Sequence, residues 1–236
     1  MEQQANFGHD QILPNAGRAK DAILFLKIYA GLEVVLLLIN VVFIMTFEEG
    51  LWASPEGVFT GLGVALVMMI AAIILPIAFI MWMRRAYANL HRAGVQDLQF
   101  NEGWAAGAWF VPFMNFVRPY RIMKEIWIRT QTAFQSEEIE VQSHAAIKNW
   151  WISFLALGII GNIQTNLATN GNVEGSYLLG ILNCAVAIYN LLLVSKIVLA
   201  ISEMETEFAE RVRLSEAEKT ARIAGAYRLL QEGGTV

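Results

Sequence analysis

The chain has 236 residues, of which 56% are hydrophobic and only 16% are charged, and its formal net charge is -4 at pH 7. An ordinary soluble domain has about 45–50% apolar and about 25% charged residues, so this composition is typical of a membrane protein. The acidic balance argues against nucleic acid as a partner, because nucleic-acid-binding proteins carry a basic surplus. The single cysteine, Cys184, excludes a disulfide within the chain and a thiolate metal cluster.

Four long apolar runs predict an all-α, polytopic membrane protein. A helix of about 20 residues crosses the hydrocarbon core of a bilayer, and each run approaches or exceeds that length. The predicted spans are residues 22–47, 58–83, 150–168 and 176–201. No signal-peptide pattern precedes the first run, so we expect it to remain as an uncleaved anchor.

The spans divide the chain into three parts. Residues 1–19 are predicted to be a flexible tail, residues 20–201 the four-helix membrane domain, and residues 202–236 a helical tail outside the membrane. In that last tail, Ser215 and Glu218 form a capping-box pattern after a break near Leu214. We therefore expect a separate final helix over about residues 216–231.

The basic residues predict the orientation. All 17 Lys and Arg residues fall in the two tails, in the central loop 84–149, or near the ends of the spans that adjoin them. Because loops rich in Lys and Arg stay on the cytoplasmic side, both termini and the central loop are expected to be cytoplasmic.

The central loop contains a second apolar stretch, GWAAGAWFVPFMNFV, at residues 103–117. It is too short for a comfortable bilayer crossing, and Pro112 interrupts any helix through it. We expect this stretch either to lie in the membrane interface or to enter the membrane and return on the same side. Residues 119–134 then predict an amphipathic helix that begins with Pro119 in its first turn and lies along the membrane surface.

Polar side chains within the spans are the first candidates for function, because an ionisable group there needs a partner or a purpose. Glu33 and Asn40 are about two helical turns apart, and Asn183 and Asn190 have the same spacing. In antiparallel helices this predicts that the first and fourth spans are neighbours, with Glu33 near Asn190 and Asn40 near Asn183. Hydrogen bonding between helices is the structural interpretation, and an ion or proton site at Glu33 is the functional one.

The sequence offers no recognisable catalytic centre. Its three histidines are scattered over the tail and the loop, and no zinc-binding spacing, Ser-His-Asp set or phosphate-binding glycine loop is present. We therefore predict no catalytic residue, no metal ligand and no cofactor. A membrane-embedded enzyme is the least favoured class.

The central motif resembles a known family. The stretches RRAYANLHRAG from Arg84 and GWAAGAWFVPFMNFVRPYRIMKEIW from Gly103 are similar to the bacterial domain-of-unknown-function family 4328, with likeness over about residues 18–202. The resemblance implies an uncharacterised four-helix protein of the bacterial inner membrane. The residues that match the family pattern are Arg85, Ala86, Tyr87, Asn89, Leu90, Trp104, Trp109, Phe110, Pro112, Asn115, Arg118, Pro119 and Tyr120.

Arginines interleaved with aromatic residues in the central loop suggest a binding layer for anionic lipid headgroups. Its candidates are Arg84, Arg85, Arg118, Arg121, Trp104, Trp109 and Tyr120, with Pro112, Asn115 and Pro119 as the structural motif. For Arg118, a purely structural clamp is the alternative. The favoured function is thus a non-enzymatic scaffold or lipid-interacting module.

The alternative function is a homo-oligomeric ion channel or small transporter, with a polar path around Glu33. Four spans alone make a poor pore, so this function would require several copies of the chain. The expected partners are membrane lipids, and the sequence leaves open a homo-oligomer and a soluble partner of the C-terminal tail.

Overall fold

A computed structural model of the chain describes residues 12–46, 55–134 and 142–233. Over these ranges all regular structure is helical, which confirms the predicted all-α class. The elements are α1 (Ala16–Thr46), α3 (Pro55–Arg92), α4 (Trp104–Gly107), the 3-10 helix η2 (Met114–Phe116), α5 (Arg118–Phe134), α6 (Ala145–Thr169) and α7 (Val173–Gly233).

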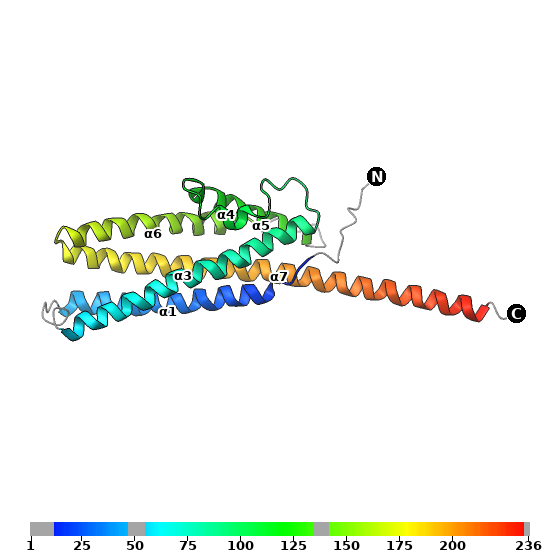
Figure 1. Ribbon diagram of the computed structural model, residues 1–236, viewed down its shortest axis with the longest axis horizontal. Coiled ribbons are helices and arrows are strands. Elements are labelled where there is room, and N and C mark those ends of the chain that lie inside the picture. The colour runs from blue at the N-terminus through cyan, green and yellow to red at the C-terminus, as the bar shows by residue number, and fades with distance from the viewer. Residues whose placement is uncertain (1–11, 47–54, 135–141, 234–236) are drawn as a thin grey trace.

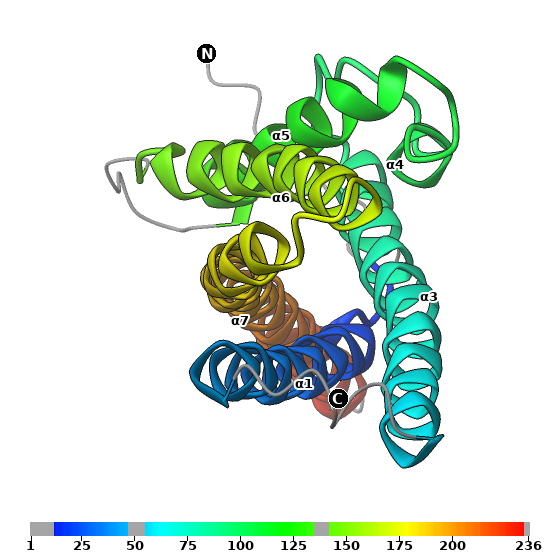
Figure 2. The same ribbon diagram turned by 90° about the vertical axis from the view of Figure 1, so that its left-hand side faces the viewer.

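The helices α1, α3, α6 and α7 are long and apolar enough to cross a membrane, as predicted. Seen along the bundle, they follow one another around a ring in the order α3, α1, α7, α6 (Figure 2). Helix α7 packs along both α1 and α6, and α3 packs along α1. The predicted neighbourhood of the first and fourth spans is therefore confirmed.

At one end of the bundle, two helix ends differ from the predicted boundaries. Helix α3 continues to Arg92, so the predicted loop 84–149 begins as helix. The predicted flexible tail, residues 1–19, ends early, because Leu13 and Asn15 are held by hydrogen bonds and α1 begins at Ala16. The backbone carbonyl of Asn15 accepts the first helical bond of α1, from Ala19 N at 3.0 Å. Residues 1–11 lie outside the described residues.

The predicted break in the C-terminal tail is also wrong, because α7 is one helix from Val173 to Gly233 (Figure 1). Ser215 does not cap a new helix; its hydroxyl donates to the carbonyl of Val212 at 2.8 Å. Glu218 instead pairs with Arg222 one turn later, at 2.6 Å. A serine satisfied by the preceding turn is compatible with a helix interior, and the surrounding Ala, Glu, Lys and Arg are good helix formers.

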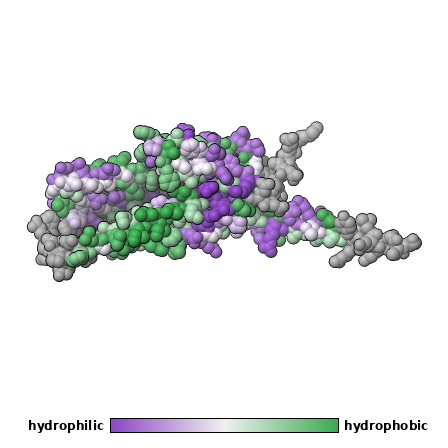
Figure 3. All heavy atoms as spheres, viewed as in Figure 1, coloured by the Kyte–Doolittle hydropathy of each residue, from purple (hydrophilic) through white to green (hydrophobic). Residues whose placement is uncertain are grey.

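The buried core lies mainly at the end of the bundle where α1 begins and α3 ends. We call it the arginine end, because Arg18, Arg84, Arg85 and Arg92 are there, and the opposite half, toward the α6–α7 connection, the distal half. Helix α5 packs against α3, α6 and α7 at the arginine end. The fully buried large residues include Trp82, Tyr87, Leu90, Ile122, Met123, Ile126, Phe134, Ile147, Val198 and Ile201. Figure 3 shows a hydrophobic surface over α1 and α3 that gives way to a hydrophilic patch near the arginine end.

Candidate functional site

The apolar stretch 103–117 is a compact loop on the side of the bundle. It contains α4 and η2, and Trp109 anchors it between helices: the Trp109 ring lies 6.0 Å from Phe79 of α3 and 5.9 Å from Phe154 of α6. The turn exposes Phe110 (75%) and Phe113 (84%) at its surface. A firmly held loop therefore displays large aromatic side chains outward.

The predicted motif residues shape this loop. Exposed Pro112 stands at the turn, where its carbonyl accepts from Met114 N at 2.8 Å. Asn115 follows, and its buried Oδ1 has no hydrogen-bond partner among the described residues. Pro119 is buried in the first turn of α5, as predicted. The indole of Trp151 donates to the carbonyl of Phe116 at 3.1 Å and ties the loop to α6.

Arg118 closes the loop with a cation–π contact. Its guanidinium carbon lies 3.9 Å from the centroid of Trp104 and 5.5 Å from that of Phe100. Such contacts stabilise by about 0.5–2 kcal/mol, depending on how far the charge is desolvated. Arg121, by contrast, is exposed, and Tyr120 is half-buried beside the Trp151 ring at 6.4 Å. Arg118 thus has a structural contact, whereas Arg121 is free to meet solvent or headgroups.

Arg84 and Arg85 lie apart from this loop, in a pocket of about 180 Å³ at the end of α3. Arg18 of α1, Arg92 and Glu102 complete its polar wall, and Arg92 lies 3.9 Å from Glu102. Arg18 and Arg92 were not among the candidates predicted from the sequence. For Arg92 the signal was the helical spacing of Arg84, Arg85 and Arg92, which places all three on one side of a helix.

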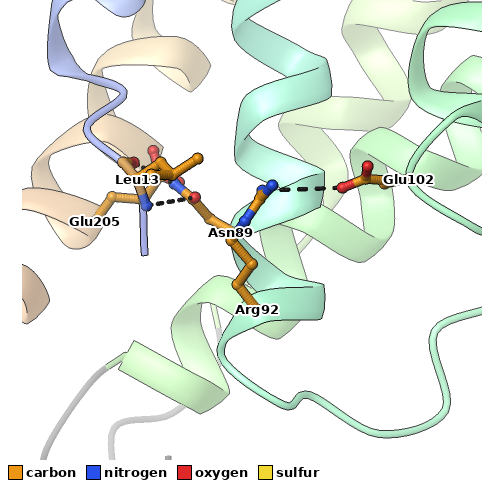
Figure 4. Close-up of polar contacts among 5 residues, drawn as sticks. All are labelled: Leu13, Asn89, Arg92, Glu102 and Glu205. Atoms are coloured by element: carbon orange, nitrogen blue, oxygen red, sulfur yellow. Dashed lines mark hydrogen bonds and ion pairs between the residues drawn. The ribbon is translucent and has the colours of Figure 1, made fainter. Parts of the chain in front are cut away.

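A buried hydrogen-bond network lies next to this arginine pocket. Asn89, fully buried, donates to Glu205 of α7 at 3.0 Å and to the carbonyl of Leu13 at 3.0 Å. Its Oδ1 accepts from Leu13 N at 3.1 Å, and Asn15 donates to the other Glu205 oxygen at 2.9 Å. Figure 4 shows Asn89 between Leu13 and Glu205, with Arg92 reaching in another direction to Glu102. The network joins the segment before α1 to α3 and α7.

The predicted pairing of Glu33 with Asn190 is wrong. Glu33 lies beside Tyr29, on its own helix, and Cys184 of α7. Asn190 turns to α6, where it donates to the Trp150 carbonyl at 2.8 Å and also to a serine hydroxyl. Because Glu33 lies beside Cys184 and not beside Asn190, the α1–α7 register differs from the predicted one by about one to two helical turns.

The pairing of Asn40 with Asn183 is wrong for a related reason. Asn40 faces Gly180, where an added Cβ would lie 2.6 Å from Asn40 Oδ1, so a larger residue there would force the Asn40 side chain to shift. Asn183 donates instead to Gln164 of α6 at 3.4 Å. The four predicted polar residues therefore do not form one ladder between two helices.

An apolar cavity of about 310 Å³ lies between the four long helices. Pro76 and Phe79 of α3, Trp109 of the loop and Leu191 of α7 are among its lining residues. Asn190 also lines it, but its amide donates to α6. Because apolar cavities do not hold ordered water, this wall provides little for an ion or a water file to bind.

Comparison with known proteins finds a family that contains the central motif. A family described as Domain of unknown function (DUF4328) matches residues 52–206, which confirms the resemblance seen in the sequence. No curated protein and no solved structure matches the chain.

Proposed function

Because the chain belongs to the family described as Domain of unknown function (DUF4328), we propose its function from its own geometry: a non-enzymatic membrane protein that interacts with lipids through the central loop. We further propose that it resides in the bacterial inner membrane with both termini cytoplasmic. The distribution of Lys and Arg supports this orientation.

The observation that carries the proposal is the exposed aromatic tip of the loop. Phe110, Phe113 and Phe116 are 75%, 84% and 56% exposed, although Trp109 and Trp151 hold the loop firmly in place. Large exposed apolar groups on an anchored loop are typical of membrane or protein contact. Exposed Arg121 follows five residues after Phe116, and this order suits aromatic groups in the lipid and a cation among the headgroups.

A fluorescent label on the loop tests the proposal. Phe113→Cys introduces an exposed thiol that the label can reach. The native Cys184 is buried, so the label should attach at position 113. In vesicles, an environment-sensitive label at this position should emit as in an apolar medium and be quenched by brominated acyl chains. The matched control is Gln96→Cys, on the exposed turn after α3, where the label should stay in water. Equal water exposure at both positions would refute the proposal.

The alternative, a homo-oligomeric channel with a polar path around Glu33, has its own test. Ion flux from liposomes is compared for the wild-type chain and Glu33→Gln. Flux that this substitution abolishes would favour the channel. What supports the lipid-interacting function instead is that Asn183 and Asn190 donate to α6 within one chain.

We also propose that the part of α7 beyond the bundle is the place for a soluble partner. The helix is exposed at every residue from Arg213 to Ala226, with charged pairs such as Lys219–Glu216 at 2.8 Å along its surface. A pull-down with and without this tail would test the idea.

A further inference from the structure

Two hollows on the α1–α3 side of the molecule share part of their wall. One is the arginine pocket described above. The other is a groove of about 250 Å³ lined by Asp21 and Phe25 of α1 and by Ile74, Ile77 and Ala78 of α3. Arg18 and Met81 line both. A ligand could therefore occupy the two hollows at once, with a polar part in one and an apolar part in the other.

The pocket carries more positive charge than the described residues balance. It has four guanidinium groups and one carboxylate, Glu102, which lies 3.9 Å from Arg92. Asp21 of the adjoining groove adds a second carboxylate, so the positive groups still outnumber the negative ones. No described carboxylate forms an ion pair with Arg18, Arg84 or Arg85. The nearby Glu205 accepts hydrogen bonds from two asparagine amides and also interacts electrostatically with Arg85, without forming an ion pair with it. Like charges gathered in one pocket repel, and a bound anion relieves that repulsion.

The buried donor in the pocket also points to an anion. Arg92 Nη1 is buried and forms no hydrogen bond with a described residue; it lies 3.9 Å from a Glu102 oxygen, which is an ion pair beyond hydrogen-bond distance. A guanidinium group presents its donors in a planar fork that fits the oxygens of a phosphate. The pocket therefore offers both charge and directed donors to a phosphate group.

The adjoining groove decides between a free anion and a lipid. Its walls at Phe25, Ile74 and Ile77 are apolar, and Ile74 and Ile77 are exposed on the membrane-length helix α3. A free phosphate would leave these side chains uncovered, whereas an acyl chain would cover them. The pocket also lies just past the uncharged run 58–83, at the depth where headgroups meet the ends of spans.

We infer that the arginine pocket and the adjoining groove together form a binding site for one phospholipid with an anionic headgroup. The phosphate is held by Arg18, Arg84, Arg85 and Arg92, and an acyl chain lies along Ile74, Ile77 and Ala78. This inference rests on the proposed lipid-interacting function and assigns it a second, defined site away from the aromatic loop.

The test titrates the purified full chain in detergent with phosphatidylglycerol and phosphatidylcholine of identical acyl chains, followed by native mass spectrometry. Phosphatidylglycerol should bind more tightly. In the double variant Arg18→Gln/Arg84→Gln, the affinity for phosphatidylglycerol should fall about fivefold for each arginine removed. The matched control is Arg213→Gln/Arg222→Gln, which removes the same charge from the exposed tail and should bind like the wild type.

A groove variant separates the lipid from a free anion. Ala78→Trp fills the groove and leaves the arginines in place, so it should weaken phosphatidylglycerol binding but not the binding of glycerol 1-phosphate. If phosphatidylcholine binds equally well, or if the pocket and tail double variants behave alike, the site is refuted. If Ala78→Trp has no effect, the pocket holds a free anion and the lipid inference is wrong.

The two proposals fail separately, because the loop label and the pocket titration probe different residues. If phosphatidylglycerol binds no better than phosphatidylcholine but the label at position 113 lies in lipid, only the arginine-pocket site is refuted. If the label at position 113 stays in water but phosphatidylglycerol still binds more tightly than phosphatidylcholine, only the lipid contact of the loop is refuted.

Discussion

Two leucines of α3 show how differently the two halves of the bundle are built. Leu90, at the arginine end, is fully buried, whereas Leu66, earlier in the same helix, is 53% exposed. At the arginine end, α5 and the loop pack on α3 as in a soluble domain. In the distal half, apolar side chains face outward, where lipid takes the place of a protein core. The arginine end is therefore the part of the bundle with a packed protein core.

The largest expected effect is the difference in stability between alanine variants of these two leucines. Leu90→Ala leaves a cavity in a packed core and should lower the free energy of unfolding by about 2–5 kcal/mol. Leu66→Ala, the same substitution on the same helix, should change it by less than about 0.5 kcal/mol, because it opens no cavity. Unfolding in detergent, followed by circular dichroism, measures both. Similar losses would mean that the two halves are packed alike.

The next effect should come from the buried network. Asn89→Ala removes the partner of the Leu13 backbone and leaves one Glu205 oxygen unpaired. Buried groups left without a partner cost about 1–3 kcal/mol each, so we expect a loss of at least about 2 kcal/mol in unfolding free energy. Asn162→Ala, where the exposed amide bonds only to its own helix, is the control and should be nearly neutral. A neutral Asn89→Ala would show that the network does not hold the segment before α1.

Tyr87→Phe should have an intermediate effect. The hydroxyl of fully buried Tyr87 lies 2.7 Å from a Glu125 oxygen and 3.2 Å from Phe100 N, and so joins α3, α5 and the turn between them. Removing it should cost about 1–3 kcal/mol. Tyr189→Phe changes a half-exposed side chain in the same way and should cost much less. The comparison uses the same unfolding measurement, and equal costs would contradict the expected role of the Tyr87 hydroxyl.

The smallest effect is expected for Glu33→Gln. The glutamine keeps the shape of the side chain beside Tyr29 and Cys184, and polar contacts within membranes average about 0.6 kcal/mol. We therefore expect a change in unfolding free energy of about this size, measured under the same detergent conditions. If Glu33→Gln lowered the unfolding free energy as much as Asn89→Ala, the distal half would also contain a rigid polar core.

The existence of the four long helices could be predicted because uninterrupted apolar length is a strong signal. The pairing of their polar residues could not. Asn190 bonds to a backbone carbonyl of α6, and every residue of the chain has such a carbonyl, so no pattern of side chains reveals it. Equal spacing of Glu33 and Asn40 with Asn183 and Asn190 was compatible with several registers.

The candidate site was predicted in part. The aromatic loop and Arg84 with Arg85 were recognised from composition, but Arg18 was not, because it joins them only through the packing of α1 on α3. Glu205 was missed for another reason: in a charged tail it resembles a solvated surface residue, and only the fold buries it. Contacts between segments distant in sequence were thus the part that local patterns could not supply.

The unbroken course of α7 sets a distance and a direction for whatever is attached at its end. From Ser202 to Gly233 a continuous helix advances about 45 Å and turns by about 100° per residue. Removing four residues would draw the end back by about 6 Å and leave it facing nearly the same way, whereas removing two would turn it to about the opposite side. A partner bound near this end would therefore be held at a distance, and on a side of the helix, that the number of residues sets.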